Sequence, residues 1–202
     1  MTGGVEAARG HARGAAMRLV LDAASLHVGF VASLGGVPVR GAFGDVRAVL
    51  ELPPAGLAGV RLTVEVLAAS IATGLALRDR HLRGRSFLDV AHHPWITYVN
   101  QRVARDNGDL MLGGRLTLRG RTRAVRIRCT CTGAGARAGH ERCLVLHASL
   151  DLPCRAHGVG VPRGLDRLNP IFLVVGARVR VDATLTVPAD LLLPILGPVP
   201  GR

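Results

Sequence analysis

The chain has 202 residues, 49% of them hydrophobic, and its formal net charge of +12 comes from arginine alone, without any lysine. The apolar content is too high for a disordered chain, and the length fits one all-β domain. Aromatic residues make up only 3% of the chain, too few for the stacking platforms of RNA and single-strand binders, so specific nucleic-acid binding is not expected. The arginines are spread along the chain, which is typical of a genome that prefers arginine to lysine.

The first residues predict a tail. Residues 1–16 mix glycine, alanine, arginine and histidine, without the apolar centre of about 7–15 residues that a secretory signal needs. We therefore expect a cytoplasmic protein with a disordered basic tail over residues 1–17, unless the true start is Met17. The barrel domain is expected over residues 18–188, followed by a Pro/Leu-rich tail over 189–202. The apolar part of that tail either caps a barrel end or mediates association as a homodimer.

Alternation of apolar and polar residues predicts a series of β-strands. The clearest run is Leu26–Leu34, which the Gly35-Gly36 pair ends. Residues 106–109 and 120–123 predict turns. Residues 19–22 open the domain, and the other alternating runs lie at residues 37–43, 46–52, 60–66, 96–98, 110–118, 125–131, 144–151 and 173–187. Roughly eight such strands, with turn signals at the spacing of a barrel, predict an all-β fold.

The run from Ser70 to Tyr98 interrupts the alternation. Thr73-Gly74 is a turn signal, the spacing of apolar residues from Arg78 to Leu88 predicts a short helix, and Pro94 restarts an extended segment. The positions that stand out are Thr73, Gly74, Arg78, Asp79, His81, Leu82, Phe87, Leu88, Asp89 and Pro94.

This run closely resembles the signature of the YceI-like family, and residues 113–123 resemble the family's second conserved strand and turn. The resemblance extends from about Leu19 to Val187. It implies an eight-stranded antiparallel, lipocalin-like barrel that binds a polyisoprenoid or a similar amphiphile, and relatives in this family are often exported. The chain departs from the family pattern at Ser25 and Ser33, which replace histidines, and at Cys154 and His157, where an arginine and an aromatic are usual.

Inward positions of the predicted strands are almost free of charge. An eight-stranded barrel has room for its own side chains or for one small ligand. The small residues Gly41, Ala48, Gly114 and Ala183 would leave space, but the pattern alone leaves open a packed interior. The resemblance favours a cavity and a non-enzymatic carrier of isoprenoid or fatty-acyl lipid, in transient contact with membrane. The expected ligand-binding residues are Phe30, Phe43, Leu62, Val64, Tyr98, Leu112, Leu116, Ile127, Leu146 and Val181.

Other chemistry has weaker support. Arg78, Asp79 and His81 could form an enzyme or metal site, but an Arg78–Asp79 pair that anchors a loop at the barrel end explains them more simply. His92 and His93 are adjacent, so both cannot easily reach one metal ion. The four cysteines are expected to be packed thiols. No cofactor is expected, and a packed barrel whose basic surface binds anionic partners remains the alternative.

Overall fold

A computed structural model describes residues 6–7, 16–34, 37–54, 56–133, 143–160 and 178–196. In this part of the chain twelve strands form one sheet in the order β1-β2-β5-β6-β8-β9-β10-β11-β12-β3-β4-β7, and every neighbouring pair is antiparallel. The strands are β1 (Glu6–Ala7), β2 (Met17–Leu21), β3 (Leu26–Leu34), β4 (Val37–Phe43), β5 (Val46–Leu52), β6 (Arg61–Leu67), β7 (Ile71–Ala72), β8 (Trp95–Asp106), β9 (Asp109–Leu118), β10 (Arg121–Gly133), β11 (Cys143–Pro153) and β12 (Arg178–Pro188).

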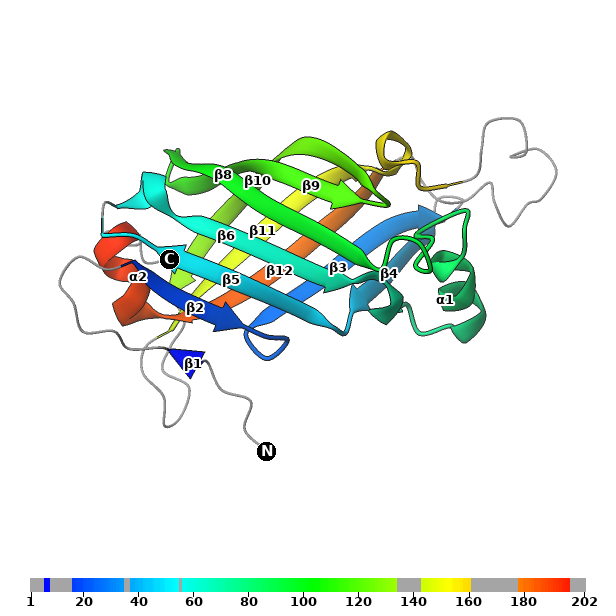
Figure 1. The fold of residues 1–202 in the computed structure, drawn as a ribbon, viewed down its shortest axis with the longest axis horizontal. Helices are drawn as coiled ribbons and strands as arrows, with labels where there is room; N and C mark the ends of the chain where they lie inside the picture. The colour runs from blue at the N-terminus through cyan, green and yellow to red at the C-terminus, as the bar shows by residue number, and fades with distance from the viewer. Residues whose placement is uncertain are drawn as a thin grey trace.

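The sheet curls into a barrel-like tube, so that β3 lies near β5 although the two do not share a ladder among the described residues (Figure 1). The all-β antiparallel class is therefore confirmed, whereas the predicted number of eight strands is wrong. The added elements are short: β1 and β7 have two residues each, and β2 has five. Runs of that length are too short to show a period of two, so pattern reasoning undercounts them.

Two hairpin turns set the register of three long strands. Asn107 and Gly108 have φ of 51° and 87°, and they join β8 to β9 as the sequence predicted. The next turn is Arg119-Gly120, with φ of 52° and 66°, because Leu118 pairs directly with Arg121. The expected turn at residues 120–123 is thus wrong by about two positions. Both are two-residue loops with positive φ at each residue, the geometry that matches strand twist.

A helix lies at each end of the tube (Figure 1). Helix α1 (Ala76–Arg83) begins two residues before the predicted range and ends at Gly84, whose backbone is extended. Residues beyond Gly84 form turns, so the predicted helical spacing up to Leu88 is wrong. At the other end, the expected C-terminal tail contains the helix α2 (Ala189–Leu196). Three short 3-10 turns complete the fold: η1 (Leu57–Gly59), η2 (Ala68–Ser70) and η3 (Cys154–His157).

The barrel interior holds two apolar clusters, one toward each end. The α2 end is built from β2, β5 and α2, where Leu19, Leu21 and Val187 are 0% exposed and Leu192 and Leu196 are buried against them. Burial of this helix face caps the barrel, one of the two roles that the sequence left open for it. The α1 end has a second cluster, whose buried members are Ala68, Ile71, Phe87, Leu88, Tyr98, Leu116, Leu118, Leu152, Cys154, Val159 and Val179.

Residues 1–5 and 8–15 lie outside the described residues, as do residues 35–36, 134–142, 161–177 and 197–202. The first third of the predicted closing strand, residues 173–177, falls in one of these ranges. Within the described part, Glu6 and Ala7 pair with Val20 and Leu19 of β2. None of the described helices is long and apolar enough to span a bilayer.

Candidate lipid cavity

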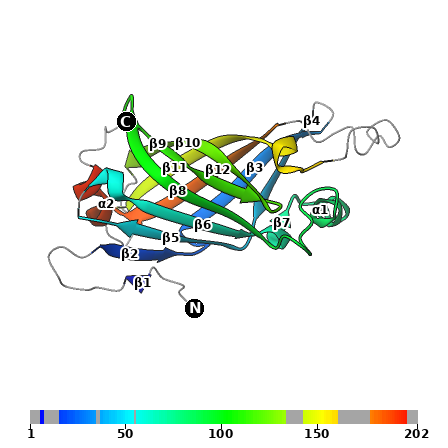
Figure 2. The same cartoon turned by 45° about the horizontal axis from the view of Figure 1, so that its top comes forward.

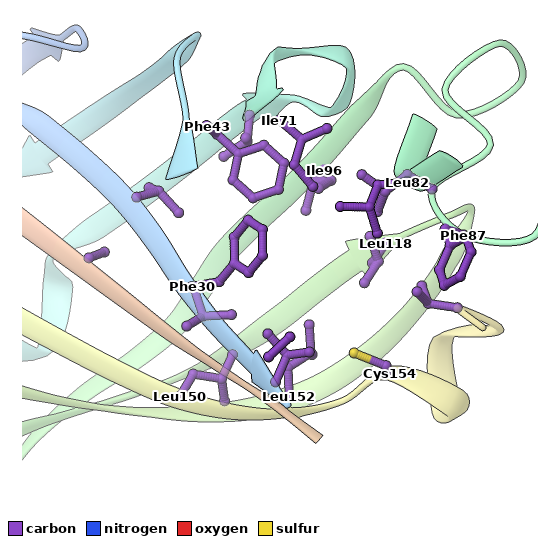
Figure 3. Close-up of a pocket in the computed structure, with 18 of the residues that line it drawn as sticks. Phe30, Phe43, Ile71, Leu82, Phe87, Ile96, Leu118, Leu150, Leu152 and Cys154 are labelled. Atoms are coloured by element: carbon purple, nitrogen blue, oxygen red, sulfur yellow. The ribbon is translucent and has the colours of Figure 1, made fainter. Parts of the chain in front are cut away.

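The α1 end of the barrel is hollow. A cavity of about 660 Å³ runs between the inner faces of the strands and reaches α1 and η3. Figure 3 shows Phe43, Ile71 and Ile96 on one side of this space, Leu150, Leu152 and Cys154 on the opposite side, and the Phe30 ring between them. The alternative of a fully packed barrel is therefore not what the structure shows.

Seven of the ten residues expected to bind ligand lie around this cavity: Phe30, Phe43, Val64, Tyr98, Leu116, Ile127 and Val181. The other three, Leu62, Leu112 and Leu146, also point inward, but they pack within the clusters and do not line the cavity. The sequence thus predicted correctly which residues of these strands point inward. The position of each residue along the barrel was not, because the period of two says which face a residue occupies and nothing about depth.

Small residues do not create the cavity in the way that the sequence suggested. A Cβ atom at Gly41 would lie 2.4 Å from the Phe30 ring, and one at Gly114 would lie 2.8 Å from the Tyr98 ring. These glycines admit aromatic rings, so their space is already filled. Ala48 is buried in the α2-end cluster. Among the four small residues, Ala183 alone lines the cavity.

Several lining residues are missed by strand periodicity because they come from the α1 connection and from η3. Leu82, Phe87 and Leu88 belong to the signature, and the sequence assigned them a structural role only. Cys154 and Val159 come from the irregular segment after β11. Helical and loop residues reach the cavity through tertiary packing, and no period marks them in advance.

The mouth of the cavity lies beside α1. Among the lining residues, Leu75 and Leu77 are 53% and 60% exposed, so water reaches the cavity wall at this point. Arg78 and His81 line the same rim, and Arg78 is half-buried whereas His81 is exposed. The interior is therefore largely apolar, with aliphatic and aromatic side chains, and the rim carries Arg78 and His81.

Thr73 is the centre of the signature loop. Its backbone N–H, at 3.0 Å, and its hydroxyl both donate to Asp79 Oδ1. Arg78 donates from Nε to Thr73 Oγ1 at 2.7 Å and from Nη2 to the Thr73 carbonyl at 2.8 Å. The sequence predicted that Arg78 and Asp79 pair directly. Within the described residues no ion pair joins them, because each is held by Thr73 instead, but the expected anchoring of the loop is present.

Two more arginines fasten the connection to the barrel. Arg83 donates to the carbonyls of Ala69 and Ile71, both at 2.8 Å, which holds the end of α1 against β7. Arg119 donates to the carbonyls of Gly158 and Arg85, so it ties the α1 connection to η3. Charge-assisted bonds of this kind are about twice as strong as neutral ones, so the rim is held in a fixed position.

Tyr98 and Cys154, which lie in the inner wall of the cavity, stay neutral near pH 7. Burial raises the pKa of Tyr98 to about 12, and its hydroxyl lies 3.4 Å from the Leu112 carbonyl. Burial also raises the pKa of the Cys154 thiol to about 11, so this thiol is a poor nucleophile. A cavity whose few polar atoms are uncharged suits an apolar ligand and offers little to a charged substrate.

His157 occupies the family's aromatic position and is 0% exposed. Its Nδ1 lies 3.0 Å from the Arg121 carbonyl, to which the neutral ring donates, while Nε2 has no partner in the part of the chain that the structure describes. Desolvation lowers the pKa of His157, so the ring is uncharged and acts as a packed aromatic group.

The histidines and cysteines that the sequence singled out do not come together as a site among the described residues. His92 Nδ1 lies 2.9 Å from Asp89 Oδ1, and this contact lowers the Asp89 pKa. His93 instead lies against Gly120. Within the described residues no three metal-ligating side chains come together. Cys129 and Cys131 share the inner face of β10 as free thiols, and burial raises the pKa of Cys129 to about 12.

Comparison with known proteins places these features in a family. Residues 19–187 match the profile of the YceI-like domain. The chain is 32% identical to Protein YceI of Escherichia coli over 54% of its own length and 60% of that protein's. It is 31% identical to the UPF0312 protein ECA1782 of Pectobacterium atrosepticum over 50% of its own length and 53% of that protein's. The matches thus span a little over half the length of these curated relatives.

Solved structures share the fold. BcnA of Burkholderia cenocepacia superposes with a TM-score of 0.67 at 22% identity, over 80% of this chain and 96% of that one. A polyisoprenoid-binding domain from Saccharophagus degradans superposes with a TM-score of 0.56 at 16% identity, over 84% and 96% of the two chains. With a profile match from Leu19 to Val187, the range in which the signature lies, the chain belongs to the YceI-like domain family.

Proposed function

We propose that the protein binds a polyisoprenoid or another long-chain amphiphilic lipid inside the barrel and carries it without chemical change. The observation that carries this proposal is the apolar cavity of about 660 Å³ with its polar rim at α1. This volume falls within the ~300–1,000 Å³ of ordinary ligand pockets. The similar fold of the polyisoprenoid-binding domain from Saccharophagus degradans supports the same class of ligand.

The lining chemistry matches an amphiphile. The apolar chain would lie among residues such as Leu116, Ile127 and Val181, and removal of its surface from water would drive binding at about 25 cal/mol per Å². Its polar end would remain at the rim, near Arg78 and His81. An enzyme site at this loop would use Arg78 and Asp79, but both side chains are hydrogen-bonded to Thr73. A carrier needs no catalytic group there, so this arrangement supports the carrier role.

Neighbouring positions on β9 give a matched test. Leu116 is 8% exposed and lines the cavity, whereas the Thr117 hydroxyl lies 2.8 Å from Thr122 Oγ1 on the exposed face. Leu116→Gln places an amide in the cavity, where an unpaired amide costs about 1–3 kcal/mol, so affinity for a fluorescent prenyl or fatty-acyl probe should fall about ten- to hundred-fold. Thr117→Gln should bind the probe as wild type does.

Thermal melts of both variants would show whether the fold survives the change. The carrier function is wrong if wild-type protein binds no such probe, or if the two variants, both folded, bind it equally. Mass spectrometry of an organic extract of natively purified protein would identify the ligand that it carries.

A further inference from the structure

The rim of the cavity exposes leucines that have no packing role inside the barrel. Leu75 and Leu77 flank the start of α1 and are more than half exposed, although both touch the cavity. Val37, at the start of β4, is 63% exposed, and its strand neighbour Val39 lines the cavity. Figure 2 shows α1 and the start of β4 at the same end of the barrel. Single exposed apolar residues are common, but here two line one opening and a third lies at the same end of the barrel.

The exposed charge in the segment that follows these leucines is positive. Residues 76–86 contain four arginines and a single acidic residue, Asp79, which is 8% exposed and bonded to Thr73. Arg78 and Arg83 are engaged with loop carbonyls. The exposed side chains of Arg80 and Arg85 make no ion pair among the described residues. The segment therefore presents positive charge to solvent without a compensating exposed carboxylate.

The barrel wall differs in this respect. Among the described residues, four of its arginines face a carboxylate on a neighbouring strand, as in Arg47–Glu65 at 2.7 Å and Arg128–Asp109 at 2.7 Å. Such pairing reduces the local field, whereas α1 combines uncompensated arginines with exposed leucines. Apolar residues beside arginines on one exposed helix surface are typical of segments that lie in the interface of an anionic bilayer.

We propose that the mouth patch, formed by Leu75, Leu77, Arg80 and Arg85, docks the protein on an anionic lipid bilayer. This inference rests on the proposed carriage of lipid. The leucines would enter the headgroup region, and the two arginines would meet lipid phosphates. The cavity mouth would then face the bilayer, and a lipid chain could pass between the two with little contact with water. A bilayer fits better than a protein partner because the same opening must receive a membrane-derived ligand.

The test separates docking from ligand binding. Wild-type protein should sediment with vesicles of equimolar phosphatidylcholine and phosphatidylglycerol at least about tenfold better than with phosphatidylcholine alone. The double variant Arg80→Glu with Arg85→Glu should lose about tenfold or more of this binding, and its uptake of a prenyl probe from the anionic vesicles should slow to a similar degree. Neither residue lines the cavity, so binding of the probe supplied in detergent should stay at the wild-type level.

A control with the same charge change uses Arg102→Glu with Arg115→Glu, two exposed positions on β8 and β9. It should keep most of the vesicle binding. Leu77→Asp should weaken sedimentation, because it removes an inserting side chain without altering Arg80. The docking proposal is overturned if wild type ignores anionic vesicles, or if the control pair loses as much binding as the α1 pair. If wild type docks but takes up no probe in detergent, the carrier function fails while docking stands.

Discussion

The two ends of the barrel use the same kind of strand residues and reach different outcomes. At the α2 end, aliphatic rows from β2, β5 and β12 meet Leu192 and Leu196 of the helix, and the space is filled. At the α1 end, similar rows meet a helix whose one buried residue is Asp79, and a cavity of about 660 Å³ remains. The two ends differ in how many apolar side chains the helix buries: α2 buries Ala189, Leu192 and Leu196, whereas α1 contributes only the partly buried Leu82.

The interactions that attach the two helices to the barrel differ accordingly. Helix α2 is attached by apolar burial, which is non-directional and closes any gap that it can. Helix α1 is attached by directed hydrogen bonds that Arg78 and Arg83 donate and Asp79 accepts, which fix it on the rim without filling the interior. A polar attachment can therefore keep a mouth open where an apolar one would collapse it.

The largest expected effect contrasts one leucine from each end. Leu21 is 0% exposed in the packed cluster, whereas Leu150 lines the cavity and is only half-buried. Leu21→Ala should lower the free energy of unfolding by about 2–5 kcal/mol, and Leu150→Ala by roughly half as much, because its neighbours already border a void. Urea denaturation of ligand-free protein measures both. Equal losses would mean that the α1 end is packed in solution, and the comparison would be wrong.

A smaller effect concerns the polar attachment of α1. Arg78→Ala removes both bonds to Thr73 and should cost about 1.5–3 kcal/mol, whereas Arg115→Ala, at an exposed strand position, should cost near zero. Thr73→Val should also destabilise the fold, since it takes the hydroxyl away from Arg78 and Asp79. Melting temperatures of the three variants provide the measurement. If Arg78→Ala and Arg115→Ala have the same melting temperature, the hydrogen bonds to Thr73 do not stabilise the attachment of α1.

The smallest expected effect is a dependence of stability on pH that differs between the ends. Near the cavity, burial lowers the His157 pKa, so the unfolded chain takes up a proton first and stability should fall as pH drops below 6.5. In the packed cluster, burial raises the Cys129 pKa to about 12, so stability should fall as pH rises above 9, where the unfolded thiol ionises.

Single variants show which residue causes the loss of stability at acid pH and which causes the loss at alkaline pH. His157→Gln should flatten the loss of stability below pH 6.5, and Cys129→Ala should reduce the loss of stability above pH 9. Denaturation midpoints across the pH range provide the readout. An unchanged loss of stability at acid pH in His157→Gln would show that this ring is not held neutral by burial.

Much of the fold was readable in advance. The Leu26–Leu34 strand is observed with the predicted bounds, and the inward parity of Val64, Leu116 and Val181 is as expected. The signature from Thr73 to Pro94 gave the family, which the match over residues 19–187 shows. The predicted number of strands is wrong because β1, β2 and β7 are too short to show an alternating pattern. The C-terminal helix was not predicted because Pro188 and Pro194 suggested breaks in regular structure.

The sequence by itself determined which side chains face inward, because alternation follows from the geometry of a strand alone. Only the tertiary structure decided which of them meet a void. Gly41 and Gly114 looked like open space, yet the rings of Phe30 and Tyr98 fill it, and Arg78 and Asp79 looked like a pair, yet Thr73 stands between them. Depth along the barrel, the filling of one end and the partner of a polar group depend on residues far apart in the chain, and no local pattern records them.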